Sequence, residues 1–152
     1  MFDILYPLPS LQDTQTLAQK IVQCLQPCDV VLLKGDLGAG KTTLAKKIIT
    51  LLNPEITSIP SPTFTLSQTY DTPKGDVWHY DLYRLKSSEE VLELGIDEAF
   101  ASGICLIEWP ERLGNLRLPS ALLKINLVIM GPDDQRQAEL TLSESWQQRW
   151  PA

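Results

Sequence analysis

The sequence predicts an α/β fold with three αβα layers and a mixed sheet, in which a parallel core is extended by antiparallel hairpins. Two short apolar runs, residues 29–34 and 104–108, have the composition of strands buried on both faces, which is typical of a parallel sheet. Helical patterns lie on both sides of the first run, and later strands pair across polar turns. The chain has 152 residues and no visible linker or repeat, so we expect one domain, residues 1–152.

The first half of the chain alternates helix and strand. Residues 14–25 place apolar side chains on one helical face, and Asp13 or Thr14 is the expected N-cap. The strand that follows leads into a glycine-rich loop. A second helical pattern begins after this loop and is expected to end at Asn53-Pro54, because the residue before a proline disfavours helix.

The middle of the chain is predicted to add a hairpin. The proline-bounded residues 59–64 are expected to form a loop. Alternating polar and apolar residues then occur at 65–70 and 77–83, on either side of the polar turn DTPKGD. Two alternating runs separated by a turn of this kind indicate antiparallel strands.

The second half continues with a helix, a strand and another hairpin. Ser87 and Glu90 have the spacing of a capping box for a helix that ends near Gly95. After the strand at 104–108, apolar residues alternate with others over 123–129 and lead through the turn GPDDQ into a second hairpin.

The charge and the cysteines limit the class of protein. Lys and Arg number 13 against 19 Asp and Glu, a net charge of −6, which disfavours a stand-alone nucleic-acid binder. No apolar run could span a membrane and no secretory signal is visible, so a cytoplasmic protein without membrane association is expected. We interpret Cys24, Cys28 and Cys105 as buried thiols, because His79 is the only histidine available for a zinc site.

The glycine-rich segment 35–42 carries the strongest functional signal. It matches G-x-x-x-x-G-K-[ST] in full, the pattern of a phosphate-binding P-loop, with a strand before it and a helix after it. In such a loop backbone N–H groups turn toward phosphate oxygens, Lys41 meets the β/γ charge and Thr42 holds Mg²⁺. The sequence therefore predicts the fold of a P-loop NTPase. The residues expected to contact nucleotide here are Asp36, Leu37, Gly38, Ala39, Gly40, Lys41, Thr42 and Thr43.

A P-loop NTPase also needs an acid to orient Mg²⁺, usually at the end of a neighbouring buried strand. Glu108 closes the apolar run 104–107 and is the best candidate. Asp81 is the rival, because aspartate is depleted from strands yet occurs here in HYDLYR. It would orient the attacking water or bind the ion through water, or else form a salt bridge with Arg84 or Lys86.

Three further residues have weaker signals. We interpret His79 as a core imidazole rather than a catalytic group. Trp109, beside Glu108, would cover the nucleotide, dock a partner or simply pack. Arg136 would reach a nucleotide or an RNA phosphate, or remain solvated.

Four segments together resemble the bacterial TsaE family: GDLGAGKTT (35–43), SPTF (61–64), HYDLYRL (79–85) and IEWPERL (107–113). They occur in the family's order and spacing. That family comprises small ATPases needed to make threonylcarbamoyladenosine beside the anticodon of tRNAs. The resemblance implies an ATP-binding and ATP-hydrolysing subunit with Mg²⁺ as cofactor. It would act with the transferase pair TsaD and TsaB, resetting that complex between cycles and meeting tRNA only through it.

The resemblance also assigns roles to residues of the matching segments. It implies that Lys41 and the loop amides hold phosphates, with Lys41 contributing to catalysis. It places Thr42 and Glu108 on Mg²⁺ and makes Asp81 a catalytic residue required for turnover.

A switch and one outlying contact complete the carry-over from the family. Ser61 and Thr63, in the SPTF segment, resemble a switch that senses the γ-phosphate. Thr14 is the candidate for a nucleotide contact near the first helix. From about Leu116 onward only the hairpin pattern matches.

Two rival functions share the same ATP site. A small P-loop kinase would phosphorylate a metabolite, with His79 or Asp81 as base to the acceptor hydroxyl. A nucleotide-gated interaction module would use ATP only to select a partner-binding conformation, without useful turnover. A GTPase is disfavoured, because the chain has no N-K-x-D motif.

Overall fold

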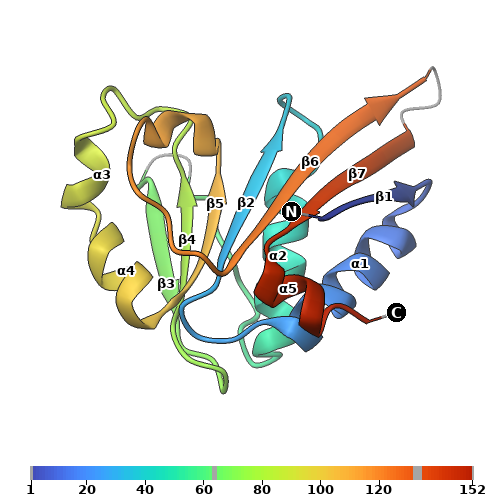
Figure 1. The fold of residues 1–152 in the computed structure, drawn as a ribbon, viewed down its shortest axis with the longest axis horizontal. Helices are drawn as coiled ribbons and strands as arrows, with labels where there is room; N and C mark the ends of the chain where they lie inside the picture. Colours follow the sequence, from blue (N-terminus) through green and yellow to red (C-terminus); the bar gives the residue numbers. More distant parts are fainter. Residues whose placement is uncertain (1, 63–64, 132–134, 152) are drawn as a thin grey trace.

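The computed structural model of the chain describes residues 2–62, 65–131 and 135–151. The strands form a seven-stranded sheet, and Figure 1 shows the helices packed against it. The elements are, in chain order, β1 (Phe2–Leu8), α1 (Leu11–Cys24), β2 (Val30–Gly35), α2 (Lys41–Leu52), β3 (Ser67–Tyr70), β4 (Val77–Asp81), α3 (Glu90–Glu93), α4 (Ile96–Ser102), β5 (Ile104–Glu108), the 3-10 helix η1 (Pro110–Leu113), β6 (Leu122–Met130), β7 (Gln135–Leu142) and α5 (Glu144–Arg149).

The sheet is mixed, with strand order β1-β7-β6-β2-β5-β4-β3. Strands β6, β2, β5 and β4 run parallel to one another and form the centre. Strand β3 pairs antiparallel with β4 at one edge, and β7 and β1 continue antiparallel from β6 at the other. A parallel core extended by antiparallel hairpins is therefore confirmed.

Helices cover both faces of this sheet. In β2, Val31 and Leu33 join the apolar cluster that contains the buried faces of α1 and α2. The intervening Val30 and Leu32 join a second cluster with the buried residues of α3 and α4. Since successive side chains of a strand point to opposite faces, the two clusters lie on opposite sides of the sheet. The elements thus form the three expected layers.

The N-terminal region differs from the prediction in two ways. Residues 2–8 form an edge strand, β1, which was not predicted. Helix α1 begins at Leu11, and its N-cap is Ser10 rather than Asp13 or Thr14. Asp13 instead occupies the third helical position, where its carboxylate accepts from the Ser10 N–H at 3.0 Å. The acid is thus the reciprocal partner of a capping box.

The segment after β4 also departs from the prediction. Strand β4 ends at Asp81 rather than continuing to residue 83. Glu90 accepts from the Ser87 N–H at 3.0 Å, one half of the expected capping box, but α3 lasts only four residues. Gly95, with φ +74°, separates it from a further helix, α4, that was not predicted. Helix α5 was missed as well.

The cysteines are only partly as expected. Cys24 and Cys105 are buried, but Cys28 is exposed, so the interpretation of all three as buried thiols is wrong for Cys28. This residue has φ +75° and lies in the turn that leads into β2.

Across the ranges that the structure describes, no helix has the length and apolar character needed to cross a membrane.

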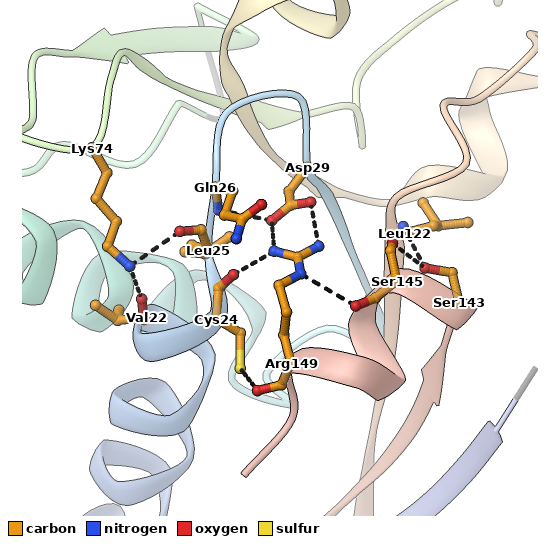
Figure 2. Close-up of polar contacts among 10 residues, drawn as sticks. All are labelled: Val22, Cys24, Leu25, Gln26, Asp29, Lys74, Leu122, Ser143, Ser145 and Arg149. Carbon is orange, nitrogen blue, oxygen red and sulfur yellow. Dashed lines mark hydrogen bonds and ion pairs between the residues drawn. The ribbon is translucent and has the colours of Figure 1, made fainter.

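Two cationic side chains from distant parts of the chain donate hydrogen bonds to the C-terminal end of α1 (Figure 2). Arg149 of α5 donates to both carboxylate oxygens of Asp29, at 2.8 and 2.9 Å, and to the carbonyl of Cys24. Lys74, from the turn between β3 and β4, donates to two carbonyls at the end of α1, at 2.6 and 3.0 Å. Such donors satisfy carbonyls that a helix end leaves without partners.

Candidate functional site

The loop between β2 and α2 follows a path that only glycine permits at its two ends. Gly35 has φ +148°, and a Cβ at this position would lie 2.6 Å from the Leu127 carbonyl oxygen. Gly40 has φ +107° and is the N-cap of α2. No described side chain caps this helix end, so its first N–H groups and the positive end of its dipole are available to an anion.

Lys41 opens α2, and its ammonium lies against the loop itself. The Nζ atom donates to the carbonyls of Gly35 and Asp36, at 2.5 and 2.8 Å. It also lies 4.2 Å from the centre of the Trp109 ring. The residue is 5% exposed, and this burial lowers the pKa of Lys41 from its ordinary value, although the negative charge of Glu108 opposes the shift.

Thr42 and Glu108, the two residues expected to bind Mg²⁺, are in direct contact beside the loop. The Thr42 hydroxyl donates to Glu108 Oε1 at 2.6 Å. The other oxygen, Oε2, lies 2.7 Å from Nε2 of His79. Glu108 is 1% exposed and His79 is fully buried. His79 is thus in the core, as interpreted, but its ring contacts a candidate site residue.

Asp81 lies beside this group because β4 and β5 are parallel neighbours. Their register pairs Asp81 with Glu108, so both strands bring an acid to the same carboxyl edge of the sheet. Asp81 is 5% exposed and accepts from the Tyr83 N–H at 3.1 Å. A cleft of about 420 Å³ is lined by both acids and by Lys41.

Trp109 forms one wall of this cleft. Its backbone has φ +60°, a left-handed conformation that is uncommon for a bulky residue. Its ring packs against Tyr83, with ring centres 4.9 Å apart, and covers the Lys41 ammonium. A contact of this kind with a lysine stabilises the position of the cation.

A second cleft, of about 330 Å³, lies along the loop and the β1–α1 connection. Thr14 lines it, together with Gly40 and Thr43. Arg136 of β7 lines it too, and its guanidinium donates to the Gly38 carbonyl at 3.0 Å. The structure therefore brings Thr14 next to the loop, although the two are far apart in sequence.

Sequence reasoning missed part of this second cleft. Pro9, Ser10 and Leu11 line it, and none of them was a candidate because β1 and the true start of α1 were not predicted. The signal was present in Ser10-Leu-Gln-Asp13, since a serine with an acid three residues later is typical of a capping box.

The remaining candidates have separate positions. Every predicted loop residue lines one or both clefts except Asp36. The carbonyl of Asp36 accepts from the Lys41 ammonium. Leu37 is 65% exposed. Ser61 is exposed and is not among the residues that line either cleft. Thr63 lies outside the described residues.

The chain is similar to known proteins over most of its length. The sequence model of the family "Threonylcarbamoyl adenosine biosynthesis protein TsaE" matches residues 8–138. The tRNA threonylcarbamoyladenosine biosynthesis protein TsaE of Rickettsia bellii is 46% identical over 134 residues, which are 88% of this chain and 92% of the relative. The protein of the same name from Bacillus subtilis is 38% identical over 132 residues, 86% of this chain and 80% of the relative.

A solved structure agrees with these sequences. The crystal structure of YdiB from Bacillus subtilis has a TM-score of 0.74 and 30% identity, and the match covers 97% of this chain and 90% of that one. The family match spans both clefts and the glycine-rich loop between them. The chain therefore belongs to the TsaE family of threonylcarbamoyl adenosine biosynthesis proteins.

Proposed function

We propose that this protein is an Mg²⁺-dependent ATPase with a P-loop NTPase fold, and that it supports tRNA threonylcarbamoyladenosine synthesis together with TsaD and TsaB. Family membership supports the pathway. One observation carries the ATPase activity: Lys41, Thr42 and Glu108 converge at a single cleft at the end of the glycine-rich loop. This is the set of groups that phosphoryl transfer requires.

The two clefts suggest how ATP would lie. The phosphates would contact the N–H groups of the loop and of the first turn of α2. The nucleoside would occupy the cleft that Thr14 and Arg136 line, and the terminal phosphate would reach the cleft of Glu108. Lys41 would then exchange its bonds to loop carbonyls for a charge-assisted bond to phosphate.

The oxygen atoms at the cleft that Lys41, Asp81 and Glu108 line fit Mg²⁺. Thr42 Oγ1 and Glu108 Oε1 are hard donors of the type that this ion prefers, and they already lie 2.6 Å apart. The hydroxyl donates a hydrogen bond to the carboxylate, so the lone pairs of Thr42 Oγ1 remain available to a cation. Bound there, Mg²⁺ would neutralise charge on the β- and γ-phosphate oxygens.

Asp81 is the residue that we assign to turnover. It lines the same cleft as Glu108, opposite it across the β4–β5 register. A carboxylate in this position would orient the attacking water by accepting its proton in a hydrogen bond. The role separates binding from hydrolysis, because Asp81 would not be needed to hold the phosphates.

The partners and the cellular location belong to the same proposal. A net charge of −6 is unfavourable for direct tRNA contact but compatible with a subunit that reaches tRNA chemistry through TsaD and TsaB. We expect this chain to work with them in the cytoplasm. Ser61 and Thr63 would transmit the nucleotide state to that complex.

The test is ATP binding and hydrolysis by the purified chain, alone and with the TsaD–TsaB pair. Lys41→Ala should weaken ATP binding about 10–150-fold, from the loss of a bond worth about 1.5–3 kcal/mol. Asp81→Asn should keep binding and lose hydrolysis. Lys46→Ala is the matched control, since Lys46 also lies on α2 but lines neither cleft.

Each result has a definite meaning. Slow turnover that rises when the pair is added supports the proposal. Unchanged ATP binding by Lys41→Ala refutes the phosphate-loop assignment. Turnover that ignores the pair but rises with a small metabolite favours the kinase. Full support of tRNA modification by Asp81→Asn favours the interaction module.

A further inference from the structure

A fully buried histidine lies directly behind the carboxylate at the end of β5. His79 Nε2 is 2.7 Å from Glu108 Oε2, while the other oxygen of Glu108 accepts from Thr42. We propose that His79 is a positioning residue that fixes the Glu108 carboxylate for the divalent cation. This inference rests on the proposed function, because it assumes that Glu108 serves a metal ion.

The contact follows from the pairing of two parallel strands. Residues 77, 79 and 81 of β4 point to the face of the sheet that α2 covers, as do residues 104, 106 and 108 of β5. The register pairs His79 with Leu106, so Glu108 is the next residue of β5 on that face. His79 therefore reaches Glu108 from within the core, whereas Thr42 reaches it from the cleft.

Hydrogen-bond accounting explains why a polar ring is placed there. An ionised carboxylate only accepts, so both Thr42 and His79 Nε2 must donate to it. Among the described residues, the other ring nitrogen, Nδ1, has no hydrogen-bond partner and is buried. The single polar contact of this buried ring is thus directed at one oxygen of Glu108. An apolar side chain would pack there without leaving a nitrogen unsatisfied.

The consequence concerns the orientation of the carboxylate. With Oε2 held by His79, rotation of the Glu108 carboxylate is restricted and Oε1 stays directed toward Thr42. Hydrogen-bonding partners behind a metal ligand typically account for 10–100-fold in metal affinity. Among the described residues, His79 forms no hydrogen bond with the glycine-rich loop itself. It should therefore affect the affinity for the metal ion, and leave the affinity for nucleotide in the absence of metal unchanged.

The experiment compares two changes at one position. His79→Leu has similar volume but no donor, while His79→Gln keeps an N–H near the position of Nε2. ADP affinity is measured by calorimetry in EDTA and over a series of Mg²⁺ concentrations. Mn²⁺ affinity of the protein–ADP complex is measured by electron paramagnetic resonance. Tyr70→Phe is the control, because Tyr70 also has a buried polar atom without a partner among the described residues, but lies on β3.

We expect His79→Leu to bind the cation about 10–100-fold more weakly in the presence of ADP. Its ADP affinity in EDTA should equal that of the parent, and His79→Gln should recover most of the cation affinity. Tyr70→Phe should match the parent throughout. If His79→Leu does not fold, His79→Asn replaces it, because its shorter amide cannot reach Glu108 as glutamine does.

The outcomes distinguish this inference from the proposed function. Parent-like cation affinity in His79→Leu or His79→Asn would overturn the positioning role. Equal losses of ADP affinity with and without the cation would also overturn it, since they would indicate a purely structural role. If ADP affinity of the parent itself ignores Mg²⁺ and Mn²⁺, the metal site of the proposed function fails instead.

Discussion

Replacing Arg149 by methionine should destabilise the fold, because it leaves a buried carboxylate without its counter-ion. The side chain of Asp29 is only 2% exposed and that of Arg149 is 19% exposed. Removing one partner of a buried ion pair costs about 3–5 kcal/mol. Asp29 keeps a bond from the Gln26 N–H at 2.8 Å, so we expect the lower end, about 3 kcal/mol.

Urea unfolding measures this loss directly. With a slope of about 2 kcal/mol per molar urea, a loss of about 3 kcal/mol lowers the midpoint by roughly 1.5 M. Midpoints rather than amplitudes should be compared, since Trp146 lies 4.9 Å from the guanidinium and its fluorescence will change. The slope should stay constant, because the variant and the parent expose almost the same surface area on unfolding.

A double-mutant cycle with Asp29→Asn supplies the control. If the two side chains act on each other, the variant carrying both Arg149→Met and Asp29→Asn will be more stable than the sum of the single losses implies. Additive losses, or a midpoint shift below about 0.5 M for Arg149→Met, would refute the reasoning. The pair would then behave like an ion pair on the surface.

Three further predictions concern other parts of the fold. Gly35→Ala should cost at least about 1–3 kcal/mol in urea unfolding, because the new Cβ would lie 2.6 Å from a backbone carbonyl oxygen of β6; an unchanged midpoint would contradict this. A thiol reagent at about pH 8 should modify Cys28 alone before unfolding, because burial raises the pKa of the other two thiols, that of Cys105 to about 12; mass spectrometry counts the adducts. A hydrogen bond to Asp71 raises the pKa of Asp76. The stability that this hydrogen bond contributes is therefore present at low pH and is lost as the pH rises through that pKa. Asp76→Asn should therefore flatten the acidic part of the Tm profile, and an identical profile would count against it.

The parts of the site that were predictable depend on local sequence. The glycine-rich loop follows from residue spacing within eight positions, and the strand before it and helix after it are each indicated by their own pattern. Glu108 was predictable because acids at the ends of parallel strands reach the same edge. Asp81 was its rival, and the structure places Oε1 of Glu108, rather than Asp81, 2.6 Å from the Thr42 hydroxyl.

The parts that were not predictable depend on pairing between distant segments. Strand β1 contains Pro7 and lies at an edge, so its own sequence gives a weak strand signal. It forms because β7 provides hydrogen bonds along its whole length. Likewise, the contact of His79 with Glu108 requires the register of β4 against β5, which no local pattern specifies. Helix α5 is six residues long, too short for a clear period.

The pairing of β1 with β7 also determines when this protein can be completed during its synthesis. Phe2 pairs with Leu142 and Leu8 with Arg136, so β1 leaves the ribosome long before the strand with which it pairs. Leu8 and Arg136 both line the cleft beside Thr14. That cleft can form only after β7 has emerged, whereas β2, α2 and β5 precede β7 in the chain and can assemble earlier. A nascent chain would therefore hold the glycine-rich loop between β2 and α2 before it has the cleft that Thr14 and Arg136 line.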